Sequence, residues 1–142
     1  MTFPKCQKNP DLLGKLGCLV TCFANIMQIA TKVEVTPKDF NDMIIKNNGY
    51  NYLLIKKCPV GTESNLIFSV VEKIMKCKIK RVDVGNYVHH NRVFWIARIQ
   101  KKNTGHYINV LRDYNSKLVC FDVLDGNLIL TSNISWLLKV AV

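Results

Sequence analysis

The sequence is poor in acidic side chains and in histidine. It holds 10 Asp and Glu against 20 Lys and Arg, which gives a formal net charge of +10 at pH 7. With only three histidines, few side chains are left to act as an acid–base catalyst near neutral pH. The 142 residues also lack Gly/Ser-rich linkers, repeats and low-complexity segments, so we expect a single globular domain over residues 1–142.

Segments that would place the chain in a membrane or export it are missing as well. No apolar run reaches the ~18 residues that span a bilayer, so we expect no membrane span. Residues 1–10 are polar and contain no apolar signal core, so we expect no signal peptide. These absences favour a soluble protein, or one that a partner carries into place.

The cysteines are irregularly spaced, at Cys6, Cys18, Cys22, Cys58, Cys77 and Cys120. An even number permits three disulfides, but without an export signal this set favours mostly free thiols in a reducing compartment. Cys18 and Cys22 are not followed by a second ligand pair at the spacing of a zinc finger. We therefore expect neither a metal nor another cofactor.

Basic residues are spread along the chain and are densest at Lys73, Lys76, Lys78, Lys80 and Arg81. Such a group is compatible with binding to nucleic acid or another anionic polymer. No aromatic residue interleaves with these lysines in the sequence, so stacking on bases is not indicated. The other interpretation is a solvated face at the end of a helix, where cations also suit the helix dipole.

Apolar periodicity predicts helices in the first half. Residues 18–29 are apolar nearly all round, which is typical of a buried helix. Thr36, Pro37 and Asp39 predict the N-cap and first turn of a second helix, which ends at residues 47–49 (Asn-Asn-Gly). We expect a third helix from near Thr62 or Ser64. Its buried face would consist of Leu66, Ile67, Val70, Val71, Ile74 and Met75.

The second half changes to short segments rich in β-branched and aromatic residues, separated by polar turns. The expected strands are Ile79–Val84, Arg92–Ile99, His106–Arg112, Lys117–Val123 and Leu128–Thr131, and residues 136–137 (Trp-Leu) are expected in a last strand or turn. Helices followed by an antiparallel meander predict an α+β fold, with N-terminal helices packed on a C-terminal antiparallel sheet.

Cys18 directly follows Gly17 and opens the apolar helix. The N-terminus of a helix carries partial positive charge and unpaired N–H groups, and both favour the thiolate that acts as a nucleophile. Cys18 is therefore a candidate catalyst, whereas Cys22, one turn later, is expected to pack in the core as a small apolar side chain.

His106 is the histidine best placed to serve as a base, because it opens a strand, whereas His89 and His90 lie in a polar stretch and are expected to face solvent. If the following turn centres on Tyr114, His106 lies directly opposite Asp122. The carboxylate would then accept the Nδ1–H of His106 and orient the ring. Asp125 is expected in the turn that follows.

Several ordered motifs resemble one family of papain-like cysteine peptidases, related to the peptidase domain of bacteriocin-exporting transporters. Residues 17–24 (Gly-Cys-Leu-Val-Thr-Cys-Phe-Ala) resemble its nucleophile segment, and residues 35–41 its second-helix start. Residues 94–99 resemble the strand before the histidine, 105–110 (Gly-His-Tyr-Ile-Asn-Val) the histidine strand, and 119–122 (Val-Cys-Phe-Asp) the aspartate strand. The resemblance spans nearly the whole chain and implies a papain-like fold.

The same resemblance implies a role for each matching residue. Cys18 would be the nucleophile, His106 the general base and acid, and Asp122 the residue that orients the histidine. Gln7, the only glutamine upstream of Cys18, would help to bind the oxyanion. The implied activity is hydrolysis of a peptide or amide bond through a Cys18 thioester.

Within the family, the Gly-Cys-Leu-Val-Thr-Cys variant looks most like proteins of bacteriophages and their hosts. The resemblance implies a peptide or peptidoglycan stem-peptide substrate, and a location in the host cytoplasm or in a virion. Two alternatives stay open from the sequence. One is a catalytically inactive papain-like domain that serves as a virion structural or binding protein. The other is a basic module that binds nucleic acid or a host protein.

Overall fold

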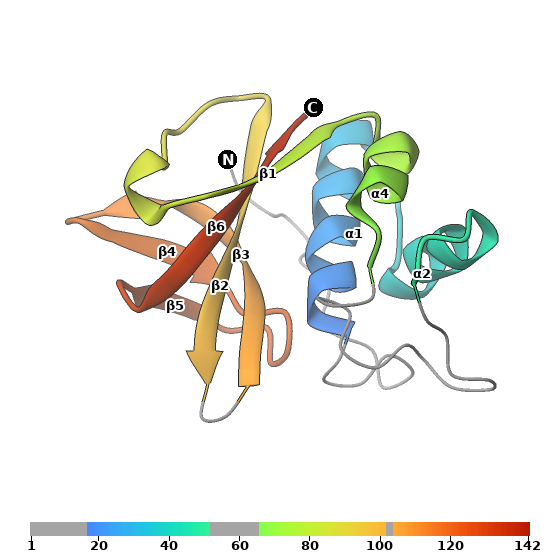
Figure 1. Cartoon of the computed structure of the whole chain (residues 1–142). Helices are drawn as coiled ribbons and strands as arrows, with labels where there is room; N and C mark the ends of the chain where they lie inside the picture. Colours follow the sequence, from blue (N-terminus) through green and yellow to red (C-terminus); the bar gives the residue numbers. More distant parts are fainter. Residues whose placement is uncertain (1–16, 52–65, 102–103) are drawn as a thin grey trace.

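The structure of the protein, a computed structural model, describes residues 17–51, 66–101 and 104–142 (Figure 1). Its described part is an α+β fold in which helices precede an antiparallel sheet of six strands. The elements in chain order are α1 (Cys18–Thr31), α2 (Pro37–Lys46), α4 (Phe68–Met75), β1 (Lys78–Val82), the 3₁₀ turn η2 (Val84–Asn86), β2 (Val93–Lys101), β3 (Thr104–Tyr114), β4 (Lys117–Phe121), β5 (Leu128–Thr131) and β6 (Ile134–Ala141).

The order of strands in the sheet is β1-β6-β2-β3-β4-β5. Strands β2 to β5 form the predicted meander, but β6 returns between β1 and β2, so the prediction of a simple meander is wrong at this strand. The reason lies in the two faces of β6. Leu137 belongs to one buried cluster and Leu138 to the other, and a strand with apolar side chains on both faces suits the interior of a sheet.

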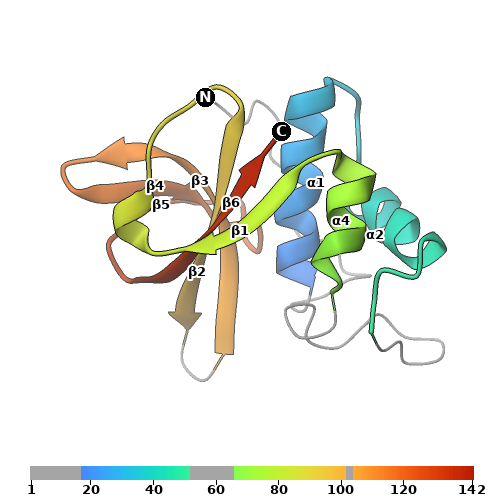
Figure 2. The ribbon, with the colours of Figure 1, turned by 45° about the horizontal axis from the view of Figure 1, so that its top comes forward.

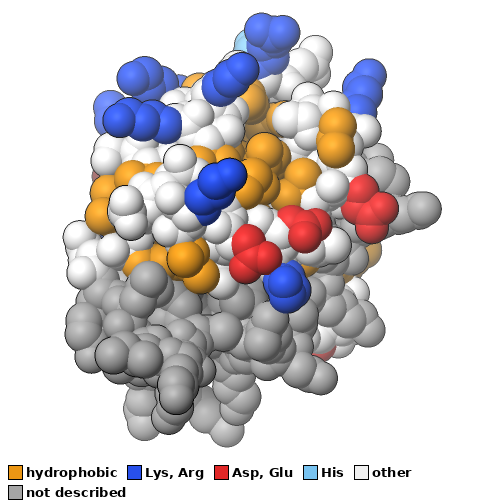
Figure 3. Space-filling view, turned by 90° about the vertical axis from the view of Figure 1, so that its right-hand side faces the viewer, with side chains coloured by type: hydrophobic (Ala, Val, Ile, Leu, Met, Phe, Trp, Pro, Cys, Tyr) orange, Lys and Arg blue, Asp and Glu red, His pale blue; other side chains and the backbone are white. Residues whose placement is uncertain are grey.

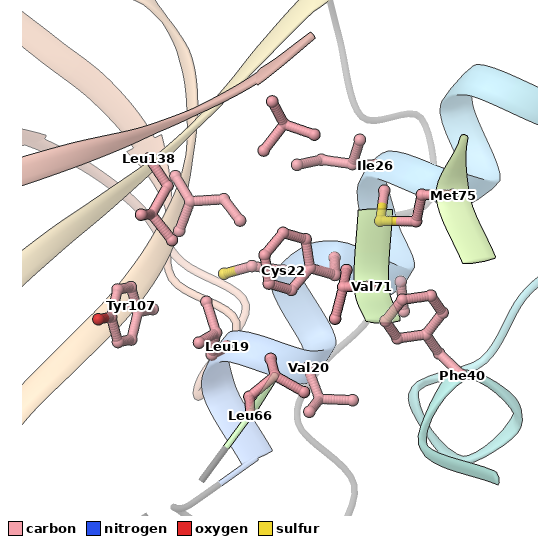
Figure 4. Close-up of a cluster of buried hydrophobic side chains, with 14 of the residues drawn as sticks. Leu19, Val20, Cys22, Ile26, Phe40, Leu66, Val71, Met75, Tyr107 and Leu138 are labelled. Atoms are coloured by element: carbon pink, nitrogen blue, oxygen red, sulfur yellow. The ribbon is translucent and has the colours of Figure 1, made fainter. Parts of the chain in front are cut away.

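The helices lie on one side of the sheet, as two views of the ribbon show (Figures 1 and 2). α1 is the central helix, and its residues 18–26 are buried, which confirms the prediction of a buried helix. Its side chains pack with those of α2, α4, β3 and β6 (Figure 4); the labelled residues there are Leu19, Val20, Cys22, Ile26, Phe40, Leu66, Val71, Met75, Tyr107 and Leu138. This core fixes the start of α1 against the sheet.

α2 begins as the sequence predicts. Thr36 accepts a hydrogen bond from the backbone N–H of Asp39 (3.0 Å), and the carboxylate of Asp39 accepts one from the backbone N–H of Thr36 (3.2 Å). Pro37 occupies the first helical position, and Asn47 is the C-cap. The capping box satisfies two N–H groups that the helix itself leaves unpaired.

The described helix α4 corresponds to the third helix expected from the sequence. Thr62 and Ser64 lie outside the described residues, and the described helix starts at Phe68 with Ile67 as its N-cap. Leu66 forms an isolated bridge with Tyr50 instead of a helical turn. Val71 and Met75 are buried as predicted.

The β3–β4 hairpin contains a tight turn and a bulge. Asn115 and Ser116 form the turn with positive φ angles of 48° and 64°, and Tyr114 pairs with Lys117. Such a two-residue turn follows the right-handed twist of the strands. Farther from the turn the register shifts, because Leu111 has no partner on β4. This extra residue is a β-bulge, and it decides which residues of the two strands share a face.

Among the described helices, none is both long enough and apolar enough to cross a membrane.

Candidate functional site

Cys18 is the first residue of α1, with Gly17 as the N-cap. The hydroxyl of Thr21 donates to the backbone carbonyl of Gly17 at 2.9 Å and ties the first turn of the helix to its cap. Cys18 itself is buried, with 6% of its surface exposed. The predicted nucleophile therefore lies at the positive end of the central helix, in a partly desolvated position.

His106 lies near the start of β3, opposite Ile99 of β2. Its ring is buried, and Nε2 lies 2.7 Å from Oδ1 of Asp122. An ionised carboxylate only accepts hydrogen bonds, so Nε2 is the donor in this contact. The sequence predicted this pair, but it assigned the contact to Nδ1. The use of Nε2 leaves Nδ1 as the ring nitrogen for another partner.

Asp122 follows the last residue of β4, and its carboxylate is held by the turn that begins there. Oδ1 also accepts a hydrogen bond from the backbone N–H of Leu124 at 2.9 Å. The backbone of Asp122 pairs with Asn127 and Gly126 across the same turn. Asp125 accepts from the N–H of Asn127 (2.9 Å), so it belongs to this turn as predicted. The local backbone thus helps to hold the carboxylate in the position from which it contacts His106.

The pKa of His106 reflects these neighbours. Burial by itself lowers the pKa, because it disfavours the charged ring. The hydrogen bond from His106 to Asp122, together with a hydrogen bond and charge interaction with Cys18, outweighs burial and raises the pKa to about 9. The structure therefore brings Cys18, His106 and Asp122 together, with the imidazole ring between the Cys18 side chain and the Asp122 carboxylate.

The predicted register of the hairpin is wrong, although it selected the right partner. A turn centred on Tyr114 would place His106 directly opposite Asp122, but the actual turn is centred farther along the chain, between Asn115 and Ser116. Beyond the bulge at Leu111, the last pair of the ladder is Asn109 and Phe121, and one further step places Asp122 opposite Ile108. Ile108 and His106 are two residues apart and lie on the same face of β3, so the carboxylate reaches the ring diagonally.

A pair of buried amides connects α1 to the histidine strand. The Asn25 side chain donates to Oδ1 of Asn109 at 2.8 Å, and the Asn109 side chain donates to the backbone carbonyl of Cys22 at 3.1 Å. Asn25 is 2% exposed and Asn109 is fully buried. Sequence reasoning missed both residues. The sequence did contain a signal for them, because one amide side chain lies in the middle of an apolar helix and the other in an apolar strand. A buried amide needs a hydrogen-bond partner, so the two could have been expected to pair.

The remaining candidates lie apart from this cluster. Cys22 is buried in the core as predicted, and His89 and His90 are exposed as predicted. Burial raises the pKa of Cys77 to about 11 and of Cys120 to about 12, so neither thiol is activated. Gln7, which is expected to help bind the oxyanion, lies outside the described residues, as do Cys6 and Cys58.

No group of three or more His, Cys, Asp or Glu side chains within residues 17–51, 66–101 and 104–142 is arranged to hold a metal ion. Cys18, Cys77 and Cys120, which lie in those ranges, are free thiols.

The basic group at the end of α4 is separate from this cluster. Lys73, Lys76 and Lys78 border an open cavity of about 580 Å³ at the junction of α4 and β1. Seen from the helix side, Lys and Arg side chains are most frequent toward the upper edge, and the acidic side chains lie lower on the same face, beside other basic ones (Figure 3). Arg81 differs from the lysines, because its guanidinium lies 3.6 Å from the ring centroid of Trp136. Arg81 of this basic group thus has an aromatic neighbour in the folded protein, although the two residues are far apart in the sequence.

The sequence matches no protein-family model, and a search of curated proteins finds no significant relative.

Proposed function

We propose that the protein is a cysteine peptidase or amidase with a papain-like fold, in which Cys18, His106 and Asp122 form the catalytic triad. The observation that carries this proposal is the His106–Asp122 contact of 2.7 Å with Cys18 as the second partner of the ring. A nucleophile, a base and an orienting carboxylate from three separate parts of the chain are the groups of a catalytic triad for acyl transfer.

In the first step, a Cys18 thiolate attacks the carbonyl carbon of the substrate amide. The pKa of about 9 for His106 supports a ring that stays protonated beside the sulfur at neutral pH. The protonated ring then donates its proton to the leaving amine as the C–N bond breaks, and a thioester remains on Cys18.

In the second step, His106 takes a proton from water, which attacks the thioester and releases the carboxylic acid. Asp122 keeps the ring in position through Nε2, so that Nδ1 faces the sulfur and the water in turn. The backbone N–H of Cys18, in the first turn of α1, is suited to stabilise the oxyanion in both steps, with Gln7 as the second donor.

The first test is the reactivity of each cysteine toward iodoacetamide at pH 7, followed by mass spectrometry of the individual peptides. We expect Cys18 to react at least about tenfold faster than Cys77 and Cys120, whose pKa values are raised by burial. His106→Gln should remove this advantage, whereas Cys120→Ser should leave it unchanged. Equal labelling of Cys18 in wild type and His106→Gln would contradict the proposal.

The second test asks whether the reactive thiol turns over a substrate. Wild-type protein is incubated with a mixture of peptides and with peptidoglycan fragments, and new amino termini are counted against the Cys18→Ala variant. Cleavage that depends on Cys18 supports a peptidase or amidase. A folded protein whose Cys18 is labelled but which cleaves neither substrate class would instead favour an inactive papain-like domain with a binding role.

A further inference from the structure

A basic surface with two adjoining cavities runs along α4 and onto β1. The cavity of about 580 Å³ at the junction of α4 and β1 is bordered by Lys73, Lys76 and Lys78. A second cavity, of about 390 Å³, also borders Lys73 and is lined by the apolar side chains of Val70 and Ile74. The two cavities therefore meet at Lys73, and together they combine apolar and basic side chains.

The positive charge at the larger cavity is not neutralised by ion pairs. No carboxylate within the described ranges forms an ion pair with Lys73, Lys76 or Lys78, and all three side chains are exposed. Glu72 is the acidic side chain that lines this cavity, and its Oε2 accepts a hydrogen bond from the backbone N–H of Ile79 at 2.9 Å. The cavity therefore carries an excess of positive charge that an anionic group could approach.

Two lysines of the sheet extend this charge beyond the cavities. Lys80 of β1 lies directly opposite Lys139 of β6, and Lys78 lies on the same face of β1 as Lys80. Like charges that face each other across an antiparallel pair destabilise it. The helix dipole explains cations at the end of α4, such as Lys73 and Lys76, but it does not explain those on the strands. A solvated helix end thus accounts for only part of the basic surface.

The basic surface is remote from the proposed catalytic cluster. Cys18 is the first residue of α1, whereas the end of α4 and the start of β1 lie toward the opposite end of that helix (Figures 1 and 2). On the helix side of the molecule, hydrophobic side chains reach the surface between Lys and Arg side chains (Figure 3). A ligand at this surface would therefore meet apolar and basic groups, and it would not contact the reacting thiol.

The residues that line the cavities favour a peptide over a nucleic acid. Within the described ranges, no Phe, Tyr or Trp lines either cavity, so bases would find no aromatic side chain on which to stack. The apolar groups of Val70, Ile74 and Ala141 would instead be buried by an apolar side chain of a peptide. Carboxylates of the same peptide would complement the lysines around them.

We propose that this surface docks an acidic segment of a partner protein. Apolar side chains of the segment would enter the cavities on either side of Lys73, and its carboxylates would lie against Lys73, Lys78 and Lys80. Docking here does not depend on the proposed function, because none of these residues belongs to the Cys18 cluster. The net charge of +10 would attract such a segment, so the association should be fast and should weaken with salt.

The test measures the fluorescence anisotropy of three fluorescein-labelled peptides of equal length. One repeats Glu-Glu-Leu, the second repeats Gln-Gln-Leu and lacks the charge, and the third repeats Glu-Glu-Ser and lacks the apolar side chains. We expect the Glu-Glu-Leu peptide to bind at least about tenfold more tightly than either of the others. Equal affinities for the Glu-Glu-Leu and Gln-Gln-Leu peptides would overturn the proposal.

Variants locate the binding site of the Glu-Glu-Leu peptide. Lys73→Gln/Lys78→Gln should weaken binding about tenfold, whereas Arg112→Gln/Lys117→Gln, which removes two exposed cations from the β3–β4 hairpin, should change it by less than about twofold. Ser69 is exposed and lines the larger cavity, so Ser69→Glu should weaken binding and Ser69→Lys should not. Equal binding by the two double variants would overturn the proposal.

A labelled single-stranded oligonucleotide and the reactivity of Cys18 test the other occupants. An oligonucleotide that binds more tightly than the Glu-Glu-Leu peptide, and loses this affinity in Lys73→Gln/Lys78→Gln, would assign the surface to nucleic acid and overturn the proposal. The rate of Cys18 alkylation by iodoacetamide should be the same with and without saturating peptide. A peptide that slows this alkylation would lie at the Cys18 cluster instead, and this result would also overturn the proposal.

Discussion

Asp122→Asn isolates the charge of the carboxylate from its shape. The two side chains have nearly the same size, and Asn retains an oxygen that can accept from the backbone N–H of Leu124. What is lost is the negative charge 2.7 Å from Nε2 of His106, at a position where both side chains are almost fully buried. The variant should therefore fold while the histidine loses its main stabilising partner.

The size of the effect follows from the contact that is lost. A hydrogen bond to a charged group contributes about 1.5–3 kcal/mol. The loss of that energy lowers the pKa of His106 by about one to two units from about 9. It also lowers the population of the thiolate–imidazolium pair, and with it the rate of Cys18 alkylation, by about 10- to 150-fold.

The assay is the rate of Cys18 alkylation by iodoacetamide between pH 5 and 10, with an NMR titration of the His106 ring in the same samples. Asp125→Asn is the control, because Asp125 lies in the same turn and its carboxylate accepts a hydrogen bond from the backbone N–H of Asn127 and not from His106. It should leave both curves unchanged. If the titration of His106 and the alkylation profile were the same in wild type and Asp122→Asn, the assignment of Asp122 as the orienting residue would be wrong.

Three further predictions concern stability. The pKa of His106 is raised from its ordinary 6.5 to about 9, so its contribution to the free energy of unfolding is present below pH 6.5 and lost as the pH rises to about 9; urea unfolding should show this slope in wild type and not in His106→Gln. Asn109→Leu should cost about 1–3 kcal/mol and slow Cys18 alkylation, because it leaves the buried Asn25 amide without its acceptor; the Asn25→Leu/Asn109→Leu double variant should recover part of the stability. Thr36→Ala should lower the unfolding free energy by about 0.5–2 kcal/mol through the lost cap of α2, with no change in Cys18 alkylation.

Local signals in the sequence predicted much of the fold. The capping residues of α2 and the apolar face of α1 depend on neighbours within a few residues, and both predictions are confirmed. The position of β6 between β1 and β2 depends on contacts far apart in the chain. A pattern of apolar residues shows that a strand is buried on both faces, but it does not show which strands cover its edges.

The cluster of Cys18, His106 and Asp122 was predicted through a register that does not occur. The assumed turn had an odd number of residues, and the actual hairpin combines a two-residue turn with a bulge at Leu111. Both arrangements put His106 and Asp122 on one strand face, which is why the pairing was right and the register wrong. The stacking of Arg81 and Arg98 on Trp136 joins three strands, and no sequence spacing indicates it.

The bulge at Leu111 also constrains how this hairpin can change in evolution. In an unbroken ladder that starts at the Tyr114–Lys117 pair, the sequence numbers of two facing residues differ by an odd number. The sequence numbers of His106 and Asp122 differ by 16. A descendant that kept the two-residue turn and lost the bulged residue would carry its histidine and aspartate 15 residues apart and still bring them together. A single insertion or deletion at the turn would turn the two side chains to opposite faces unless a bulge appeared or vanished with it. Insertions and deletions in this hairpin should therefore involve two residues at a time, or be accompanied by the gain or loss of the bulge.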